Sequence, residues 1–160
     1  MEKEKKRSRT VLALLFVLDA LWIFFIISRS LKTGDASLAE SDRILALVRR
    51  ILPFMTSFLI RKLGHFTEFF RLGVLLFLTA RQWERAFPGA ADGRRRVLRF
   101  LLPALAGLLA GAADECVQLG VEGRSGRLRD VLIDFSGVLL ALLIGTAVRY
   151  LKEKKKEHAG

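Results

Sequence analysis

The sequence is poor in several residue types, and each shortage narrows the kinds of site that it can build. A single cysteine, Cys116, excludes a disulfide within the chain. There are two histidines, of which only His65 lies among other charged residues of an apolar segment, and one histidine does not make a zinc site. Acidic residues are also scarce, with 16 Asp and Glu against 27 Lys and Arg, so the formal net charge is +11.

The excess of positive charge does not indicate a nucleic-acid partner. Many of the Lys and Arg residues lie in blocks at 3–9, 81–99 and 149–156. These blocks flank hydrophobic segments. They do not line one amphipathic face with interleaved aromatic side chains, which is the pattern expected for nucleic-acid binding. We therefore expect no nucleic-acid partner.

Long apolar runs indicate an integral membrane protein. Hydrophobic residues make up 52 % of the chain although 27 % is charged, so the two kinds must be segregated. A helix of about 20 apolar residues spans a bilayer, and the sequence predicts spans at about 11–29, 63–80, 97–118 and 128–150. The first run follows basic residues, as in a signal peptide, but it is too long and no small-residue cleavage site follows it. We expect a retained span.

The predicted fold is all-α: one membrane domain over residues 1–160, with four transmembrane helices and one interfacial amphipathic helix. Residues 28–41 are polar and predict a loop. Residues 44–60, ILALVRRILPFMTSFLI, predict the interfacial helix, kinked at Pro53 with two adjacent arginines on its polar side. A fifth span over this segment is the alternative, but the arginines would make it costly.

The second span carries four polar residues at i, i+3 steps in its first half: Lys62, His65, Glu68 and Arg71. This spacing keeps the four side chains near one helix face. Glu68 and Arg71 are expected to neutralise each other. His65 is then left as a candidate for proton transfer near neutral pH, although a histidine at a helix end often has only a structural role.

A second polar cluster lies where the third span ends and the fourth begins. Asp114, Glu115 and Gln118 end the third span, and Asp130 and Asp134 lie in the first turns of the fourth. Spacings of three and four residues place each group on one helix face. The glycine-rich turn between the spans, which contains Arg124, is expected to connect them at the membrane surface.

Two further features concern the interior of the bundle. Asp19 lies in the middle of the first span, and it either faces a polar centre or is satisfied by a neighbouring helix. Gly107 and Gly111 form a small-residue pair in the third span, which permits close contact between membrane helices. The fourth span has small residues at the same four-residue spacing: Gly137, Ala141 and Gly145.

The distribution of basic residues predicts the orientation. Five Lys and Arg precede the first span, six lie at 81–99 and five lie from 149 onward, against eleven elsewhere. Because Lys and Arg are enriched on the cytoplasmic side, we expect both termini and the 81–96 loop to be cytoplasmic.

With this orientation the polar clusters of the last three spans fall at one depth, near the outer surface. A shared, outward-facing site is therefore expected, and a purely structural ion-pair network is the alternative. The candidates for catalysis are His65, Asp114, Glu115 and Asp130. The candidates for substrate binding are Lys62, Glu68, Gln118, Arg124 and Asp134.

These motifs resemble those of the VanZ-like family of bacterial membrane proteins. The resemblance lies in RKLGHFTEFFRLG at 61–73, DECVQ at 114–118, Arg124, and RDVLIDFSG at 129–137. The family pattern is similar to Lys-x-x-His, Asp-Glu-x-x-Gln, Arg and Asp-x-x-x-Asn-x-x-Gly in this order. This chain departs from it with Phe69, where tyrosine is common, and Asp134, where asparagine is common.

The resemblance implies a multi-pass protein of a bacterial cytoplasmic membrane. The founding member of the family is linked to reduced susceptibility to the glycopeptide teicoplanin. Carried over residue by residue, the family motif implies roles for Lys62, His65, Asp114, Glu115, Gln118, Arg124, Asp130 and Gly137. It implies no settled reaction.

Three functions are compatible with the sequence. In the first, the site binds or modifies a lipid-linked envelope component: Arg124 and Lys62 hold a phosphate or carboxylate, and His65 or Glu115 transfers protons. The second is a non-enzymatic accessory or binding protein with the same pocket. The third, a proton-coupled transporter, is disfavoured because four spans without an inverted repeat are few for a carrier.

The sequence predicts no cofactor, and a bound divalent cation held by Glu68, Asp114, Glu115, Asp130 or Asp134 is the alternative. The acids offer oxygen ligands of the kind that Mg²⁺ and Ca²⁺ prefer, but no spacing among them is diagnostic. Nor does any motif activate Ser125 or Ser136 as a nucleophile. The expected partner is a membrane lipid or a lipid-linked envelope precursor, and both a monomer and a homo-oligomer are compatible with the sequence.

Overall fold

The computed structural model describes residues 2–88 and 93–158, with the backbone alone for residues 93–96. Its secondary structure in those ranges is entirely helical, as predicted. The helices are α1 (Glu2–Ser30), α2 (Gly34–Val48), α3 (Ser57–Ala86), α4 (Gly93–Leu119) and α5 (Leu128–Glu157).

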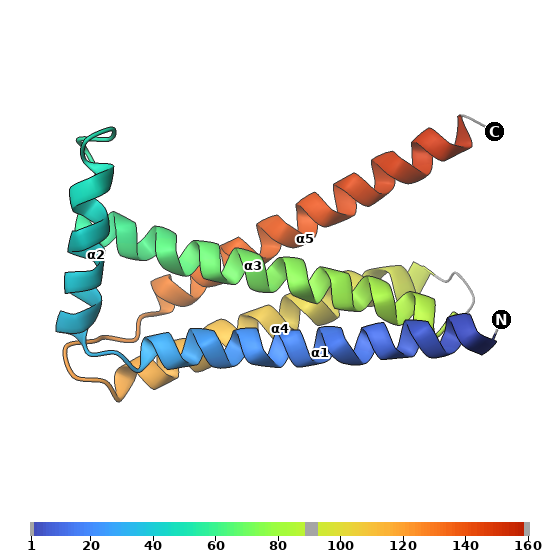
Figure 1. The fold of residues 1–160 in the computed structure, drawn as a ribbon, viewed down its shortest axis with the longest axis horizontal. Coiled ribbons are helices and arrows are strands. Elements are labelled where there is room, and N and C mark those ends of the chain that lie inside the picture. The colour runs from blue at the N-terminus through green and yellow to red at the C-terminus, as the bar shows by residue number, and fades with distance from the viewer. Residues whose placement is uncertain (1, 89–92, 159–160) are drawn as a thin grey trace.

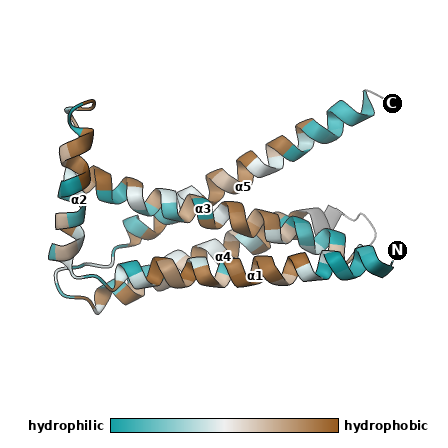
Figure 2. Ribbon diagram, viewed as in Figure 1, coloured by the Kyte–Doolittle hydropathy of each residue, from teal (hydrophilic) through white to brown (hydrophobic). Residues whose placement is uncertain are grey.

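Four helices, α1, α3, α4 and α5, are long and apolar enough to cross a membrane. The prediction of an all-α fold with four such helices is confirmed. Figure 2 shows hydrophobic residues along the middle of α1 and hydrophilic residues towards the N-terminal end of α1 and the C-terminal end of α5. The helices extend beyond the predicted spans because their charged ends continue the helix into the polar region, as in the last turns of α5.

Helix α3 lies at the centre of the arrangement, since it contacts each of the other four helices. The buried core where these helices meet contains Ile26 of α1, Phe69 and Leu72 of α3, and Val138 and Leu142 of α5. In Figure 1, α5 crosses α3 and its C-terminal half diverges from the other helices.

The two ends of the bundle differ. The N-terminal end of α1, the C-terminal ends of α3 and α5 and the start of α4 lie at one end, while α2 and the α4–α5 connection lie at the other (Figure 1). Helix α2 lies across this second end, and the backbone N–H of Gly34 donates to the carbonyl of Glu122 at 2.9 Å. The start of α2 is therefore joined to the connection that carries Arg124.

The predicted helix over residues 44–60 is wrong in its bounds. The chain leaves helix α2 at Val48 and begins α3 at Ser57, so Pro53 lies in a turn and not at a kink. A residue before proline is biased away from helical geometry, and the Thr56 side chain accepts a hydrogen bond from Leu59 N at 3.3 Å, capping α3. Residues 44–60 also form no fifth span.

Two predicted loops are shorter than expected. Most of 28–41 is helical, because α1 continues to Ser30 and the Thr33 side chain caps α2 by accepting from Ala36 N at 3.4 Å. The loop predicted at 81–96 is helical up to Ala86 and again from Gly93. The part of that loop at residues 89–92, including Gly89, lies outside the described residues.

Glycines set the close contacts among α3, α4 and α5. A Cβ atom built on Gly107 would lie 2.5 Å from Val138 Cγ1, and one built on Gly137 would lie 2.5 Å from the carbonyl oxygen of Phe66. One built on Gly73 would lie 2.8 Å from the carbonyl oxygen of Val138. The predicted role of Gly107 and Gly137 in close helix packing is confirmed.

Gly137→Ala and Gly73→Ala should each destabilise the protein by about 1–3 kcal/mol, because the added methyl group meets backbone atoms that cannot rotate away. Thermal unfolding of the detergent-solubilised protein measures the loss. Gly64→Ala is the matched control on α3, since a Cβ there meets nothing within 4 Å. Equal melting temperatures for all three variants would contradict this packing.

A cysteine at Glu122, in a Cys116→Ser background, should react with a membrane-impermeant thiol reagent added outside intact cells. Glu122 is exposed at the end of the bundle opposite the termini, and the predicted orientation places that end outside. A cysteine at Lys155, exposed near the C-terminus, should react only after lysis. The reverse pattern would invert the orientation, and labelling of both sites in intact cells would contradict the topology.

Candidate functional site

A cavity of about 170 Å³ lies at the end of the bundle that α2 crosses. It is bounded by the start of α3, the end of α4, the 120–127 connection and the start of α5. Six of the nine predicted site residues line it: Lys62, His65, Glu115, Gln118, Arg124 and Asp130. A second cavity, of about 60 Å³, is lined by Glu68 and shares His65 and Arg124 with the first. The remaining two predicted residues, Asp114 and Asp134, are buried beside His65.

The ion pair of Lys62 with Asp130 joins α3 to α5 at the cavity wall. Both side chains are partly buried, with 17 % of each exposed. Lys62 also lies over the ring of Phe58, 5.4 Å from its centroid. Because Lys62 is already paired with Asp130, it is less free to hold a ligand. In this geometry Lys62 mainly neutralises Asp130.

Gln118 links the acids at the end of α4. Its Nε2 donates to Asp114 Oδ2 at 2.8 Å and to Glu115 Oε1 at 3.3 Å, and it lies 3.4 Å from Ser30 Oγ of α1. The other Glu115 oxygen, Oε2, accepts from the backbone N–H of Arg127 at 2.8 Å. Glu115 therefore holds the start of α5 against the end of α4, because Arg127 precedes the first residue of α5.

Arg124 lies over the bundle end in the connection between α4 and α5. Its Nε donates to the Lys32 carbonyl at 3.0 Å, and one terminal nitrogen lies 3.5 Å from the Arg29 carbonyl. Partial burial lowers the pKa of Arg124 from its ordinary value, but a guanidinium remains protonated at physiological pH. Its remaining donors border both cavities.

Glu68 pairs with α1 and not with Arg71. Arg29 Nε lies 2.8 Å from Glu68 Oε1, whereas Arg71 lies over the ring of Trp22, 5.8 Å from its centroid. The ion-pair partner of Glu68 is therefore Arg29 of another helix, and Arg71, which the sequence allowed as the neutralising cation, is not within ion-pair distance of it. The ion pair of Glu68 with Arg29 connects α3 to α1 at the edge of the smaller cavity.

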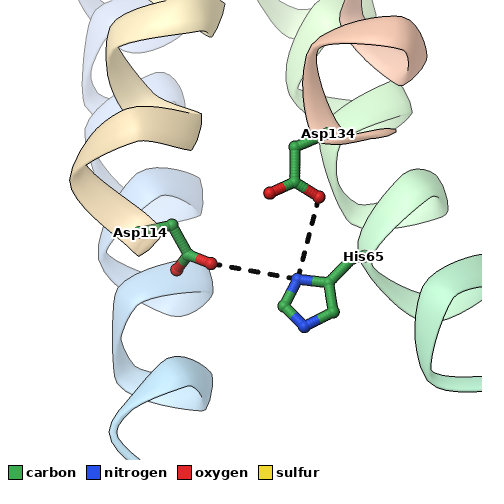
Figure 3. Close-up of side chains that lie close together, drawn as sticks. All are labelled: His65, Asp114 and Asp134. Carbon is green, nitrogen blue, oxygen red and sulfur yellow. Dashed lines mark ion pairs between the residues drawn. The ribbon is translucent and has the colours of Figure 1, made fainter. Parts of the chain in front are cut away.

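His65, Asp114 and Asp134 converge from three helices, α3, α4 and α5 (Figure 3). His65 Nδ1 lies 3.8 Å from Asp114 Oδ2 and 3.8 Å from Asp134 Oδ1. Both distances are too long for hydrogen bonds. The two carboxylates are almost completely buried, with 0 % and 1 % of their surfaces exposed. The structure thus places a buried triad directly behind the cavity wall.

The family model that matches this chain describes the VanZ/LLP1 family and covers residues 12–149. The matched range contains every predicted site residue. The chain belongs to the VanZ/LLP1 family. Comparison with curated proteins and with solved structures found no match.

Asp19 lies apart from the site in this VanZ/LLP1 member. Its Oδ2 accepts from Thr79 Oγ1 of α3 at 2.7 Å, and both residues are buried. Of the two alternatives that the sequence left open, satisfaction by a neighbouring helix is the one that the structure describes. The first span instead contributes Ser30 and Arg29 to the site.

Several residues that border the two cavities were not among the predicted site residues. Arg61 lines both cavities. It directly precedes Lys62, the first of the four polar residues that were predicted to share a face of the second span, and this position could have indicated its role. Glu40 of α2 pairs with Lys32 at 2.9 Å and with Arg29 at 3.0 Å. The hydrogen bond from Lys32, together with Arg29, lowers the pKa of the Glu40 carboxyl. No signal pointed to Glu40, because its segment was predicted to be a loop.

Gln118→Leu should destabilise the protein more than Gln82→Leu does. Gln118 donates hydrogen bonds to two buried carboxylates. Loss of a hydrogen bond to a charged group lowers the free energy of unfolding by about 1.5–3 kcal/mol. Gln82 is equally buried, but it donates to the backbone and hydroxyl oxygens of Ser8, and such neutral bonds contribute about 1 kcal/mol. Thermal unfolding of both variants in detergent compares the losses. An equal or smaller loss for Gln118→Leu would show that the carboxylates do not depend on this donor.

Proposed function

We propose that this VanZ/LLP1 member binds the anionic head group of a lipid-linked cell-envelope component at the outer face of the bacterial cytoplasmic membrane. Binding there would change the envelope surface that glycopeptides such as teicoplanin reach, and so lower susceptibility to them. The observation that supports the proposal best is the set of three arginines around the larger cavity: Arg61, Arg124 and Arg127.

These arginines retain unsatisfied positive charge. The nearby cations Lys62, Arg29 and Lys32 each have a carboxylate partner. For the three cavity arginines, no ion pair is present within the described part of the chain. A guanidinium that faces a cavity without a carboxylate partner is suited to a phosphate, which it can hold through paired, charge-assisted hydrogen bonds.

The surroundings of the cavity suit an amphiphilic ligand. Phe58 lines the cavity and is 55 % exposed, and Leu128 at the start of α5 is 76 % exposed. Leu119 at the end of α4 is 68 % exposed. In a membrane these side chains would face lipid, so a hydrocarbon tail can stay in the bilayer while its head group enters the cavity. A water-soluble ligand would gain nothing from these apolar side chains.

Arg61→Gln should weaken binding of a polyprenyl phosphate by about tenfold or more, because a hydrogen bond to a charged group contributes about 1.5–3 kcal/mol. Arg124→Gln should weaken it similarly. The measurement is equilibrium binding of a labelled polyprenyl phosphate to the protein in nanodiscs. The uncharged polyprenol of the same length should bind weakly to the native chain and be insensitive to either substitution.

Arg43→Gln is the matched control, since Arg43 is exposed on α2 at the same end of the molecule and lines neither cavity. It should bind the probe as the native chain does. In cells, expression of the native chain should raise survival in teicoplanin, and Arg61→Gln should remove that protection at equal protein level. Equal binding by all the variants would refute the head-group site. Binding without protection would refute the link to glycopeptides.

A further inference from the structure

The buried triad behind the cavity has more acceptors than donors. His65 Nδ1, Asp114 Oδ1 and both oxygens of Asp134 have no hydrogen-bond partner among the described residues. Neither carboxylate has a Lys or Arg within ion-pair distance in this part of the chain. A buried carboxylate that lacks a partner is strongly disfavoured. The triad therefore needs a positive group that these side chains do not supply to one another.

The arrangement of the three groups fits a metal ion better than it fits a shared proton. In Figure 3 the imidazole nitrogen of His65 points between the two carboxylates. A proton shared with His65 requires atoms that are about 2.5–3.0 Å apart, whereas the distances to His65 Nδ1 are both 3.8 Å. Asp114 Oδ2 accepts from Gln118, but both oxygens of Asp134 have no donor among the described residues.

The spacing of the ligand atoms is close to that of a coordination shell. One nitrogen and two carboxylate oxygens lie within 4.8 Å of one another. Two ligands at about 2.1 Å from one ion lie about 3.4 Å apart in tetrahedral geometry and about 4.2 Å apart when opposite. Small side-chain rotations would close the difference for His65 and Asp134, whose facing atoms have no other hydrogen bond among the described residues. Asp114 keeps its Oδ2 bond to Gln118 and offers its unpartnered Oδ1.

We propose that His65, Asp114 and Asp134 bind a divalent transition-metal ion. One imidazole and two carboxylates form a mixed nitrogen and oxygen set, which suits Zn²⁺ or Mn²⁺ better than it suits Mg²⁺ or Ca²⁺, whose sites are built from oxygen. The charge of the ion balances the two aspartates. His65 also lines the cavity, so an ion at this site borders the space assigned above to a head group. The metal site itself does not depend on that assignment.

The test is a metal titration of the purified full chain in detergent after treatment with a chelator. A Cys116→Ser, His158→Gln background removes the exposed thiol and the second histidine as adventitious ligands. Zn²⁺ or Mn²⁺ should bind with a stoichiometry of one ion per chain and raise the melting temperature. Mg²⁺ and Ca²⁺ should bind much more weakly. Calorimetry and elemental analysis give the affinity and the stoichiometry.

His65→Gln, Asp114→Asn and Asp134→Asn should each weaken binding of the ion by more than tenfold, since loss of an outer-shell partner alone costs about 10- to 100-fold. Asp19→Asn is the matched control. Asp19 is also buried, with one unpartnered oxygen, but it lies against Thr79 and outside the triad. It should bind the ion with unchanged affinity.

Melting temperatures measured without metal distinguish an effect of a substitution on folding from an effect on metal binding. Asp134→Asn without metal should melt at or above the temperature of the metal-free parent, because the substitution removes an unpaired buried charge. Absence of one-to-one binding by Zn²⁺ or Mn²⁺ would overturn the proposal, and so would binding that survives all three triad substitutions. Since no lipid is present, failure here leaves the head-group proposal standing, and failure of polyprenyl phosphate binding leaves the metal site standing.

Discussion

Ion pairs between partly buried carboxylates and cations of other helices fix the arrangement at the cavity end of the bundle. Asp130 of α5 pairs with Lys62 of α3, and Glu68 of α3 pairs with Arg29 of α1. Each of these pairs joins two helices that are distant in sequence. The pairs thereby fix the rotation and the axial position of α1, α3 and α5 at the end where the cavity lies.

The small residues and the polar site act together. Gly137 packs against the backbone between Phe66 and Phe70, immediately after His65, and it lies one turn from Asp134. A Cβ on Gly111 would lie 3.4 Å from the Cβ of Asp134, an ordinary van der Waals contact, so α4 and α5 lie close together there as well. Larger residues would separate the three helices, and His65 would no longer face both aspartates. Close packing of α3, α4 and α5 is therefore required to bring His65, Asp114 and Asp134 together.

Sequence reasoning found the features that depend on one helix at a time. The four spans follow from hydropathy, and the shared helix face of each polar cluster follows from residue spacing. The ends at which the clusters lie in successive spans indicated that they meet, so six of the residues around the cavity were predicted. The features that depend on contacts between distant segments were not. The partner of Glu68 is Arg29 because α1 packs beside α3, and Asp19 meets Thr79 for the same reason. The bounds of α2 and α3 were missed because the Thr33 and Thr56 caps were not recognised.

The distribution of charge within the site argues for a ligand that carries negative charge. The acids lie deepest: Asp114 and Asp134 are nearly inaccessible. The arginines lie further out, and Arg127 is exposed. A purely structural network would place each cation against an acid, as Lys62 and Arg29 are placed. Instead Arg61, Arg124 and Arg127 line the cavity, and a metal ion on the aspartates would cancel the negative charge behind them. An anion that enters from the membrane surface would then meet the positive charge of the arginines.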